Sequence, residues 1–347
     1  GQFGSRHDDE HAAGRYLKTG LLPHVKALYP PVDYQFFPRQ EDEGEVIEPR
    51  YLVPIIPMLL VNGHKTGMGV GYKSEIPPHK PLDIIRMVRN RLTSSVPYHA
   101  PVHFKNFTGE ITEKETRGVF KTETDGVVVT ELPIGLKTSA FLKAVRKETS
   151  CIEFLDGHGV GDRIHLKIRC EEKHITKLMS RPMAQNWVAF KPDGTIQEYA
   201  KEHRGRIFDD FIPVREGIYR KRKAKLISDL DAAIEKLMVK ERVVAEYVSG
   251  SWTGRDVETT EKLRLTLERL NEGFEFAVVE ADLDVSIRKL NATELGKIRG
   301  RLEGKRSERA AVATTSIQSM WLKDLDALED MLYGVQETQP LVKKRKN

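Results

Sequence analysis

Arg15 and Tyr16 are a pair of adjacent residues whose side chains could together do chemistry on a phosphate ester. A phenol that attacks a phosphodiester conserves the energy of the broken bond in a phosphotyrosine, so the ester can be re-formed without another energy source. Because tyrosine has an unperturbed pKa of about 10, the attack needs a base or metal and a cation near the pentacovalent phosphate. The guanidinium of Arg15 can hold two phosphate oxygens and stays charged. A tyrosine in a helix is ordinarily a packing residue, so the pair needs supporting context.

The composition limits the classes of protein that this chain can be. Its 347 residues suggest two or three domains. The 56 basic and 51 acidic residues leave a net charge of +5, which excludes a histone-like polycation. Contact with nucleic acid must therefore come from local clusters such as RKRKAK at 220–225 or KKRK near the C-terminus. Such runs are more often solvated helix faces or tails than specific contacts.

The cysteine content and the hydropathy indicate the cellular compartment that we expect for this protein. Cys151 and Cys170 are the only cysteines, too few for a disulfide framework or a four-cysteine zinc site. No apolar stretch approaches the roughly 20 residues of a membrane span, and no signal peptide opens the chain. We expect a soluble intracellular protein with no membrane partner. Because the first residue is Gly1, we also expect a fragment of a longer protein.

The N-terminal third predicts a helix, a connection and a buried segment. Asp8 and Asp9 can cap a helix that ends near Leu22, which would place Tyr16 in mid-helix. The proline- and acid-rich stretch 30–49 is typical of a long surface connection between domains. The apolar segment 51–63 contains two prolines, which favours buried extended structure over a helix.

The remainder predicts a strand-rich region followed by long helices. β-branched and polar residues alternate over 102–191, which indicates several antiparallel strands with a helix around 141–146. From Val214 to about Tyr247 an apolar seam recurs at helical spacing, as in a coiled coil. Its members are Ile227, Leu230, Ile234 and Leu237. Two further helical groups, around 295–302 and 317–328, could return antiparallel to the first. The fold class is therefore α+β.

Two other patterns do not fit the ligand sites that they suggest. The glycines of GMGVG at 67–71 lack the third glycine of a dinucleotide fingerprint, and no G-x-x-x-x-G-K-[ST] occurs, so ATP binding by this chain is not expected. His7 and His11 have a zinc-like spacing of four but no third ligand.

Several blocks of the sequence, taken together, resemble one family. GQFGS is followed by an alanine-rich stretch and the Arg15-Tyr16 pair, then by IEPRYLVPIIPMLLVNG and GMGVGYKSEIPPHKPLDII. In this order the blocks resemble the breakage-reunion core of type IIA DNA topoisomerases. Further likenesses cover nearly the whole chain: HFKNFTGEI and VTELPIG to tower-domain strands, QNWVAFKPDGTIQEY to the strand pair before a coiled coil, and MWLKDLDALEDML to the closing helix of a C-terminal gate.

The resemblance implies a domain organisation. Residues 1–50 would be the C-terminal part of a winged-helix domain that carries the nucleophilic tyrosine. Residues 51–212 would be a β-rich tower domain, and 213–340 a long antiparallel coiled coil with a helical C-gate. The short tower and the QNW segment are most similar to the cleavage subunits of T4-like phage topoisomerases. The acidic residues Glu280, Asp282 and Asp284 imitate the family's magnesium triad, but their position favours a charged edge strand or loop.

The resemblance also implies a reaction. Tyr16, assisted by Arg15, would form a 5′-phosphotyrosine in a transient double-strand break through which a second duplex passes. Met68 would occupy the place of the apolar wedge that bends the duplex. The expected DNA-binding residues are Gln2, Ser5, Arg6, Lys65, Gly67, Met68 and Gly69.

The implied partners are double-stranded DNA, a second copy of the chain joined through the C-gate, and a further domain or subunit that binds metal and hydrolyses ATP. Mg²⁺ and ATP would act through those other modules, in the cytoplasm or nucleoid, or in the host cytoplasm for a phage protein. One alternative is a non-catalytic scaffold that bends DNA or dimerises, with a structural Tyr16. A tyrosine nuclease or recombinase is a weaker alternative, because the chain lacks the clustered Arg and His ligands of those enzymes.

Overall fold

A computed structural model describes residues 3–7, 11–69, 71–93, 99–147, 153–156, 163–191, 193–199, 204–251, 269 and 290–333. The chain forms two compact units. The first comprises Gly1–Pro30, Val53–Val214 and Leu325–Asn347, and the second comprises Pro31–Leu52 and Arg215–Asp324. Helices and antiparallel strands occur together, so the predicted α+β class is confirmed.

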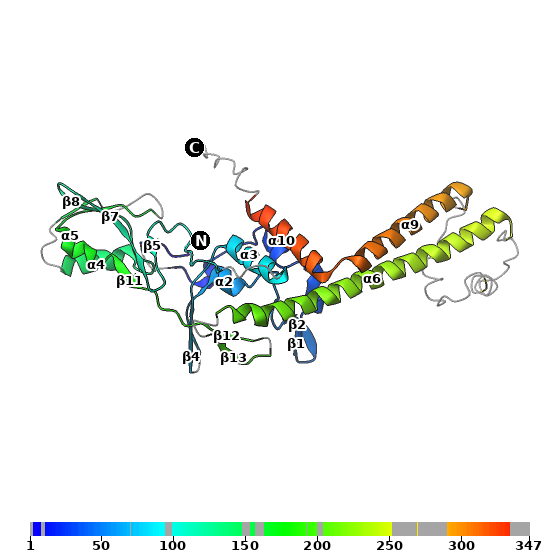
Figure 1. The fold of residues 1–347 in the computed structure, drawn as a ribbon, viewed down its shortest axis with the longest axis horizontal. Coiled ribbons are helices and arrows are strands. Elements are labelled where there is room, and N and C mark those ends of the chain that lie inside the picture. Colours follow the sequence, from blue (N-terminus) through cyan, green and yellow to red (C-terminus); the bar gives the residue numbers. More distant parts are fainter. Residues whose placement is uncertain are drawn as a thin grey trace. The chain divides into compact units, whose positions relative to one another are not determined.

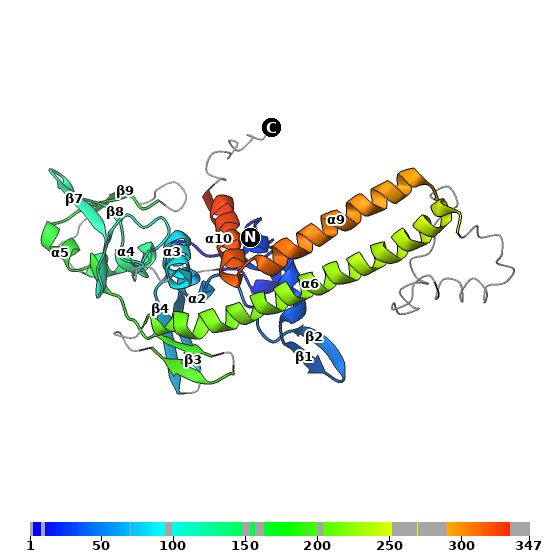
Figure 2. The ribbon, with the colours of Figure 1, turned by 45° about the vertical axis from the view of Figure 1, so that its right-hand side comes forward.

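The largest sheet of the first unit is antiparallel and four-stranded, in the order β7-β8-β10-β9. Its strands are β7 (Val119–Glu123), β8 (Gly126–Glu131), β9 (Glu153–Asp156) and β10 (Leu166–Arg169). Two helices, α4 (Thr138–Lys147) and α5 (Glu172–Thr176), lie beside it (Figure 2). Val127, Val129 and Leu166 of the sheet form one core with Phe141 of α4 and Ile175 of α5. This arrangement confirms the predicted strands and the predicted helix around 141–146.

Smaller elements complete the first unit. The hairpins are β3 (His64–Gly69) with β4 (Tyr72–Ile76), and β12 (Val188–Phe190) with β13 (Ile196–Glu198). A three-stranded sheet has the order β11-β6-β5, from β5 (Glu110–Ile111), β6 (Glu115–Arg117) and β11 (Ser180–Pro182). The helices are α1 (Val25–Leu28), α2 (Met58–Asn62) and α3 (Pro81–Leu92).

The segment 51–63 follows its prediction only in part. It forms no strand or helix before Met58 and bends at Ile55 and Ile56, but Val53, Ile55 and Ile56 are buried, as expected. The last residues then form α2, because Pro57 stands just before the helix, where its fixed φ and missing N–H are tolerated.

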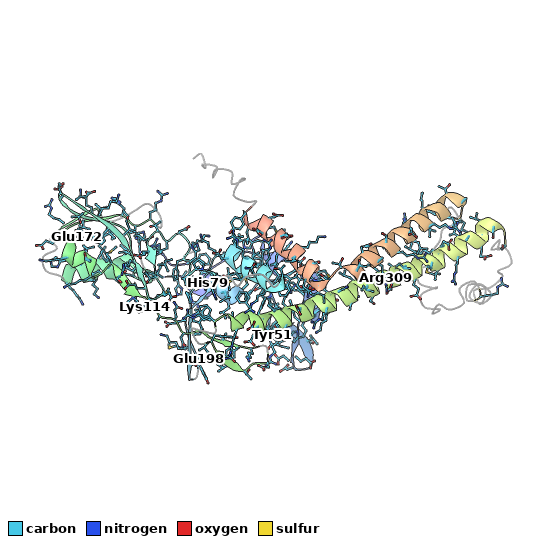
Figure 3. The ribbon with its side chains drawn as sticks, in the orientation of Figure 1. Tyr51, His79, Lys114, Glu172, Glu198 and Arg309 are labelled. Carbon is cyan, nitrogen blue, oxygen red and sulfur yellow. The ribbon has the colours of Figure 1, made fainter. Side chains whose placement is uncertain are left out.

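Long helices dominate the second unit. Helix α6 (Arg206–Ser249) enters this unit at Arg215, and α9 (Ala292–Thr314) runs beside it (Figure 1). Arg309, labelled on α9 in Figure 3, donates from Nε to Asp231 of α6 at 2.9 Å. Arg299, earlier on α9, donates to Glu241, later on α6, at 2.7 Å. The two helices are therefore antiparallel, as predicted, and Leu230 of the predicted seam is buried.

A group of buried charges fastens the start of the second unit to its helices. Asp33 lies in the 3-10 helix η2 (Pro31–Phe36) and is completely buried. It accepts from Arg215 Nη2 at 2.5 Å and from Arg222 Nε at 2.7 Å, while Arg222 Nη1 donates to Asp324 at 2.6 Å. Burial acts to lower the pKa of Arg222, but the hydrogen bonds to Asp33 and Asp324 prevail and raise it. The ring of Tyr219 contacts both guanidinium groups and stacks on Trp321.

This network corrects two predictions. Stretch 30–49 is more than a surface connection, because it contains η2 and a hairpin of β1 (Arg39–Asp42) and β2 (Glu45–Pro49). The basic run 220–225 is not a uniformly solvated helix face. Within it, Arg222 is buried, and Lys223 donates to the carbonyls of Ala313 and Thr315 at 2.8 and 2.7 Å.

Helix α6 differs from the expectation at its start. It begins at Arg206 and continues through Pro213, so the helix starts before the apolar pattern that begins at Val214. Helix α10 (Ile317–Tyr333) buries Trp321, Leu325 and Leu328 within its own chain, whereas Met331 near its end is exposed.

The three-part division at residues 50 and 212 stays a prediction, as does the assignment of tower and gate. None of the helices in the part of the chain that the structure describes is long and apolar enough to cross a membrane.

Two arginines of the same basic run provide a test of the buried network. Arg222→Ala should lower the free energy of unfolding by about 3–5 kcal/mol, because the buried Asp33 carboxylate loses the hydrogen bonds that Arg222 donates to it. Arg220→Ala should change it by less than about 0.5 kcal/mol, because Arg220 is exposed and paired only with Glu216 on the same helix. Denaturant unfolding of both variants measures the difference. Equal destabilisation would contradict the structural role of Arg222.

Candidate functional site

Tyr16 ends a single 3-10 turn, η1 (Gly14–Tyr16), and does not lie in mid-helix as predicted. Its N–H donates to the Ala13 carbonyl at 2.9 Å, and the chain leaves the turn after Leu17 N donates to Gly14. No residue of this turn is buried. A short helix is marginal in water without a packed face, and Gly14 weakens it further, so local propensity did not suffice here.

The side chain of Tyr16 is 67% exposed, so its hydroxyl is open to a large substrate. The guanidinium carbon of Arg15 lies 4.9 Å from the centre of the tyrosine ring. This cation–π contact keeps a permanent positive charge beside the phenol. The structure therefore brings together the two residues predicted to be catalytic, on a surface that a polyanion can reach.

The predicted DNA-binding residues Ser5 and Arg6 are fixed to the four-stranded sheet and its helix α4. The backbone N–H groups of Thr138 and Ser139, at the start of α4, donate to the carbonyls of Arg6 and His7 at 3.2 and 3.1 Å. Lys137 Nζ donates to the carbonyl of Ser5. The first N–H groups of a helix lack partners within it, so the segment 5–7 completes the start of α4.

The side chain of Arg6 is directed to Glu131, at the end of β8. The two form a salt bridge in which the carboxylate is 2% exposed and the guanidinium 33%. Glu131 also accepts from the backbone N–H and hydroxyl of Thr108, both at 3.1 Å, and from Leu132 N at 3.0 Å. Arg6 is therefore held by a buried carboxylate, which differs from a free phosphate ligand.

The predicted wedge, Met68, lies on hairpin β3–β4 opposite Lys73 and is 81% exposed. Gly67 and Gly69 flank it and pair with Ser74 and Tyr72. Gly63 introduces the hairpin at φ 64°, and a Cβ there would lie 2.6 Å from the Ile76 carbonyl oxygen. Only glycine fits both that conformation and that space. The backbone thus presents Met68 to solvent from a defined hairpin.

The second hairpin supports the first. Glu75 and Asn186 exchange two backbone hydrogen bonds of 2.8 Å, and the Ser74 hydroxyl donates to the Val188 carbonyl at 2.8 Å. Next to them His79 is buried, with its ring 6.0 Å from that of Trp187. Burial lowers the pKa of His79, and Nδ1 lies 3.0 Å from the Leu60 carbonyl oxygen. His79 therefore packs beside the two hairpins as a buried side chain.

An apolar groove of about 470 Å³ lies between the two hairpins. Met68 and Tyr72 line it from the first hairpin, and Phe190 and Ile196 from the second. Phe190 is 76% exposed, an unusual position for a large apolar residue. Exposed apolar residues that gather in one place mark a contact surface for a partner or ligand.

The remaining predicted residues add little to the site. Gln2, Val70, Glu280, Asp282 and Asp284 lie outside the described residues, as does the side chain of Lys65. His7 Nδ1 lies 3.2 Å from the Thr138 hydroxyl, and His11 Nδ1 lies 3.0 Å from the Ala12 carbonyl oxygen. The described part of the chain contains no group of three or more His, Cys, Asp or Glu residues that could hold a metal ion.

Sequence reasoning missed Phe190 and Glu131. Phe190 lies in the QNWVAF segment, which was expected to form strands but gave no sign that this side chain would be exposed. Glu131 follows VVVT and ends a strand in which the three valines are buried. A carboxylate inside an apolar strand predicts a buried partner, but the sequence does not identify that partner, which lies 125 residues away.

Comparisons with known proteins agree with this fold. A family model that describes the A-type subunit of DNA gyrase/topoisomerase IV matches residues 1–326. The "Putative DNA topoisomerase 2, mitochondrial" of Caenorhabditis elegans is 26% identical over 375 residues, covering 95% of this chain and 31% of that protein. The "DNA topoisomerase 2, mitochondrial" of Dictyostelium discoideum is 28% identical over 360 residues, covering 96% of this chain and 28% of that protein.

A solved structure shows the same fold. The crystal structure of the Plasmodium falciparum topoisomerase II DNA-binding, cleavage and re-ligation domain superposes with a TM-score of 0.78 at 24% identity, covering 97% of this chain and 52% of that one. The chain spans less than a third of the length of the two relatives above, at 31% and 28%.

Proposed function

The chain belongs to the DNA gyrase/topoisomerase IV family, on the side of its A-type subunits, and we propose that it is the DNA cleavage and religation core of an ATP-dependent type II topoisomerase. The observation that carries the proposal is the exposed Tyr16 phenol with the Arg15 cation beside it, within the part of the chain that the family model matches. The names of the relatives, which are DNA topoisomerases 2, support the same reaction class.

In the proposed reaction the Tyr16 phenol loses its proton, and its oxygen attacks a backbone phosphorus of DNA. A bond from phosphorus to Tyr16 forms, the bond from phosphorus to the 3′-oxygen breaks, and that oxygen takes up a proton. The product is a 5′-phosphotyrosine and a free 3′-hydroxyl, and attack of the hydroxyl reverses the step. Arg15 stabilises the charge that the phosphate oxygens gain in the transition state. Its guanidinium moves from the tyrosine ring to the phosphate when DNA binds.

Mg²⁺ and ATP belong to other parts of the complete enzyme. Because the described residues contain no acidic or histidine cluster that fits a metal ion, this chain offers no ligand set for Mg²⁺ there. We assign Mg²⁺ to a separate metal-binding domain or subunit, where it would stabilise the attacked phosphate and the leaving oxygen. ATP would drive strand passage from an ATPase domain or subunit.

The groove between the hairpins is the proposed place of DNA bending. Met68 would enter between two base pairs, and Phe190 would add apolar contact on the same surface. Unstacking one step costs about a few kcal/mol, which a bent duplex offsets by contacting more protein. Gly67 and Gly69 let the duplex approach the hairpin backbone. Gln2, Ser5 and Lys65 would contact the same DNA duplex.

Cutting both strands requires two copies related by a two-fold axis. We propose a homodimer joined through the C-gate region, 213–340, although the buried face of α10 is not the surface that joins the copies. The enzyme would act where its DNA lies, in a cytoplasm or nucleoid. The finer kinship with T4-like phage cleavage subunits, and thus a host cytoplasm, stays a prediction from the short tower and the QNW segment.

The first functional test replaces Tyr16 by phenylalanine in the complete enzyme. Tyr16→Phe should abolish covalent protein–DNA adducts trapped with denaturant, since it removes the attacking oxygen. The melting temperature should not change, because this side chain is 67% exposed. Arg15→Ala should cleave about 100-fold more slowly, which corresponds to roughly 3 kcal/mol of lost transition-state stabilisation.

Tyr34→Phe serves as the control, since Tyr34 is 39% exposed in the second unit and should retain full cleavage. Adduct formed by Tyr16→Phe would show that another residue is the nucleophile, as in an unrelated nuclease. An enzyme that binds and bends DNA but forms no adduct even with Tyr16 present would instead support the non-catalytic scaffold.

The second test concerns bending. Met68→Ala and Phe190→Ala should each reduce the bend angle of bound DNA, measured by energy transfer between dyes at the duplex ends, and reduce cleavage in parallel. Neither should lower the melting temperature, because the side chains are 81% and 76% exposed. Val46→Ala is the matched control, since Val46 is an exposed apolar residue of β2, outside both the groove and the proposed C-gate. Normal bending by both variants would contradict the proposed role of the groove.

A further inference from the structure

We propose that Arg6 and Glu131 are positioning residues for Tyr16. In this proposal the buried Glu131 carboxylate holds Arg6, and with it residues 5–7, upstream of Tyr16 in the same segment. The inference rests on the proposed function of Tyr16. It also replaces the expected role of Arg6 as a DNA contact.

The environment of Glu131 shows how Arg6 is held. Its side chain is 2% exposed, yet it keeps a carboxylate surrounded by donors. Thr108 supplies a backbone N–H and a hydroxyl, and Leu132 supplies a backbone N–H. Arg6 is the cation of this set and comes from the tyrosine segment, 125 residues away in the sequence. A buried carboxylate is expensive without a cation, so the pair fixes where Arg6 can lie.

The backbone of residues 5–7 is also bonded to the start of α4. The carbonyls of Ser5, Arg6 and His7 all accept hydrogen bonds from residues 137–139. The imidazole of His7 lies 3.2 Å from the hydroxyl of Thr138. Three consecutive residues are therefore fixed through their backbone at the start of α4, and two of them also through their side chains.

Tyr16 lies between two segments whose backbones are hydrogen-bonded to other parts of the chain, residues 5–7 and Leu28. Downstream, Ile55 N donates to the carbonyl of Leu28 at 2.9 Å, and Leu28 is buried. Between His7 and α1 no residue among those described is buried, and Tyr16 stands in this span. An exposed side chain has little packing to hold it, so its position depends on the two ends of its segment. Precise placement of a nucleophile is a large part of catalysis.

The test uses the complete enzyme with a DNA duplex. Arg6→Ala should lower the fraction of cleaved DNA at saturating DNA by about tenfold, because a loosened Tyr16 attacks less often. The Kd for DNA should stay within about twofold, and the salt dependence of Kd should not change, since no phosphate contact is lost. Arg6→Lys should restore part of the cleavage, as it keeps the charge without the fork of donors.

Two further variants separate positioning from general stability. Thr108→Val removes a hydroxyl that donates to the same carboxylate but does not touch the tyrosine segment. It should lower the melting temperature and leave the cleaved fraction unchanged. Adding Glu131→Gln to Arg6→Ala should reduce cleavage little beyond Arg6→Ala alone, because residues that act through one contact are not additive.

Three results would overturn the inference. The first is wild-type cleavage by Arg6→Ala. The second is a salt slope reduced by about 0.9, the value for one lost phosphate contact, in that variant. The third is a loss of cleavage in Thr108→Val equal to that in Arg6→Ala. Failure of the proposed function is separate, since it would show as an unmodified Tyr16 in the wild-type enzyme.

Discussion

The proposed role of Tyr16 depends on one constraint, which is that a nucleophile for a polymer must be exposed and yet held in place. Tyr16 lies on a single turn with no buried residue, so packing does not hold it. Contacts on either side of it are made at α4 by Arg6 and His7 and at Leu28 by Ile55. In our proposal these contacts position the phenol, and the short turn leaves it accessible.

Charge in this chain serves structure as much as binding. Two arginines are paired with buried carboxylates, Arg6 with Glu131 and Arg222 with Asp33. Each pair joins segments that are more than a hundred residues apart in the sequence. Exposed apolar residues show the converse, because Met68 and Phe190 contribute no core and form a surface for contact. The burial of a residue, and not its type alone, decides which role it has.

Much of the fold followed from periodicity, because strand and helix patterns report which face is buried. The strands of 102–191 and the antiparallel helices were predicted correctly for that reason. The predicted mid-helix position of Tyr16 was wrong. Helix propensity is local, whereas a helix of the predicted length needs a packed face. Arg220 and Arg222 could not be distinguished from the sequence, since the partners of Arg222, Asp33 and Asp324, lie 189 and 102 residues away from it. Phe190 was missed because exposure of a strand residue depends on its neighbouring hairpin.

The most direct test of the account is the chemical location of the covalent bond between enzyme and DNA. The complete enzyme would be trapped on a duplex with denaturant, digested with protease and nuclease, and its nucleotide-bearing peptide identified by mass spectrometry. We predict one modified peptide, with the nucleotide on Tyr16 through the 5′-phosphate and a free 3′-hydroxyl on the other DNA end. A nucleotide on any other residue, or a bond through the 3′-phosphate, would contradict the account.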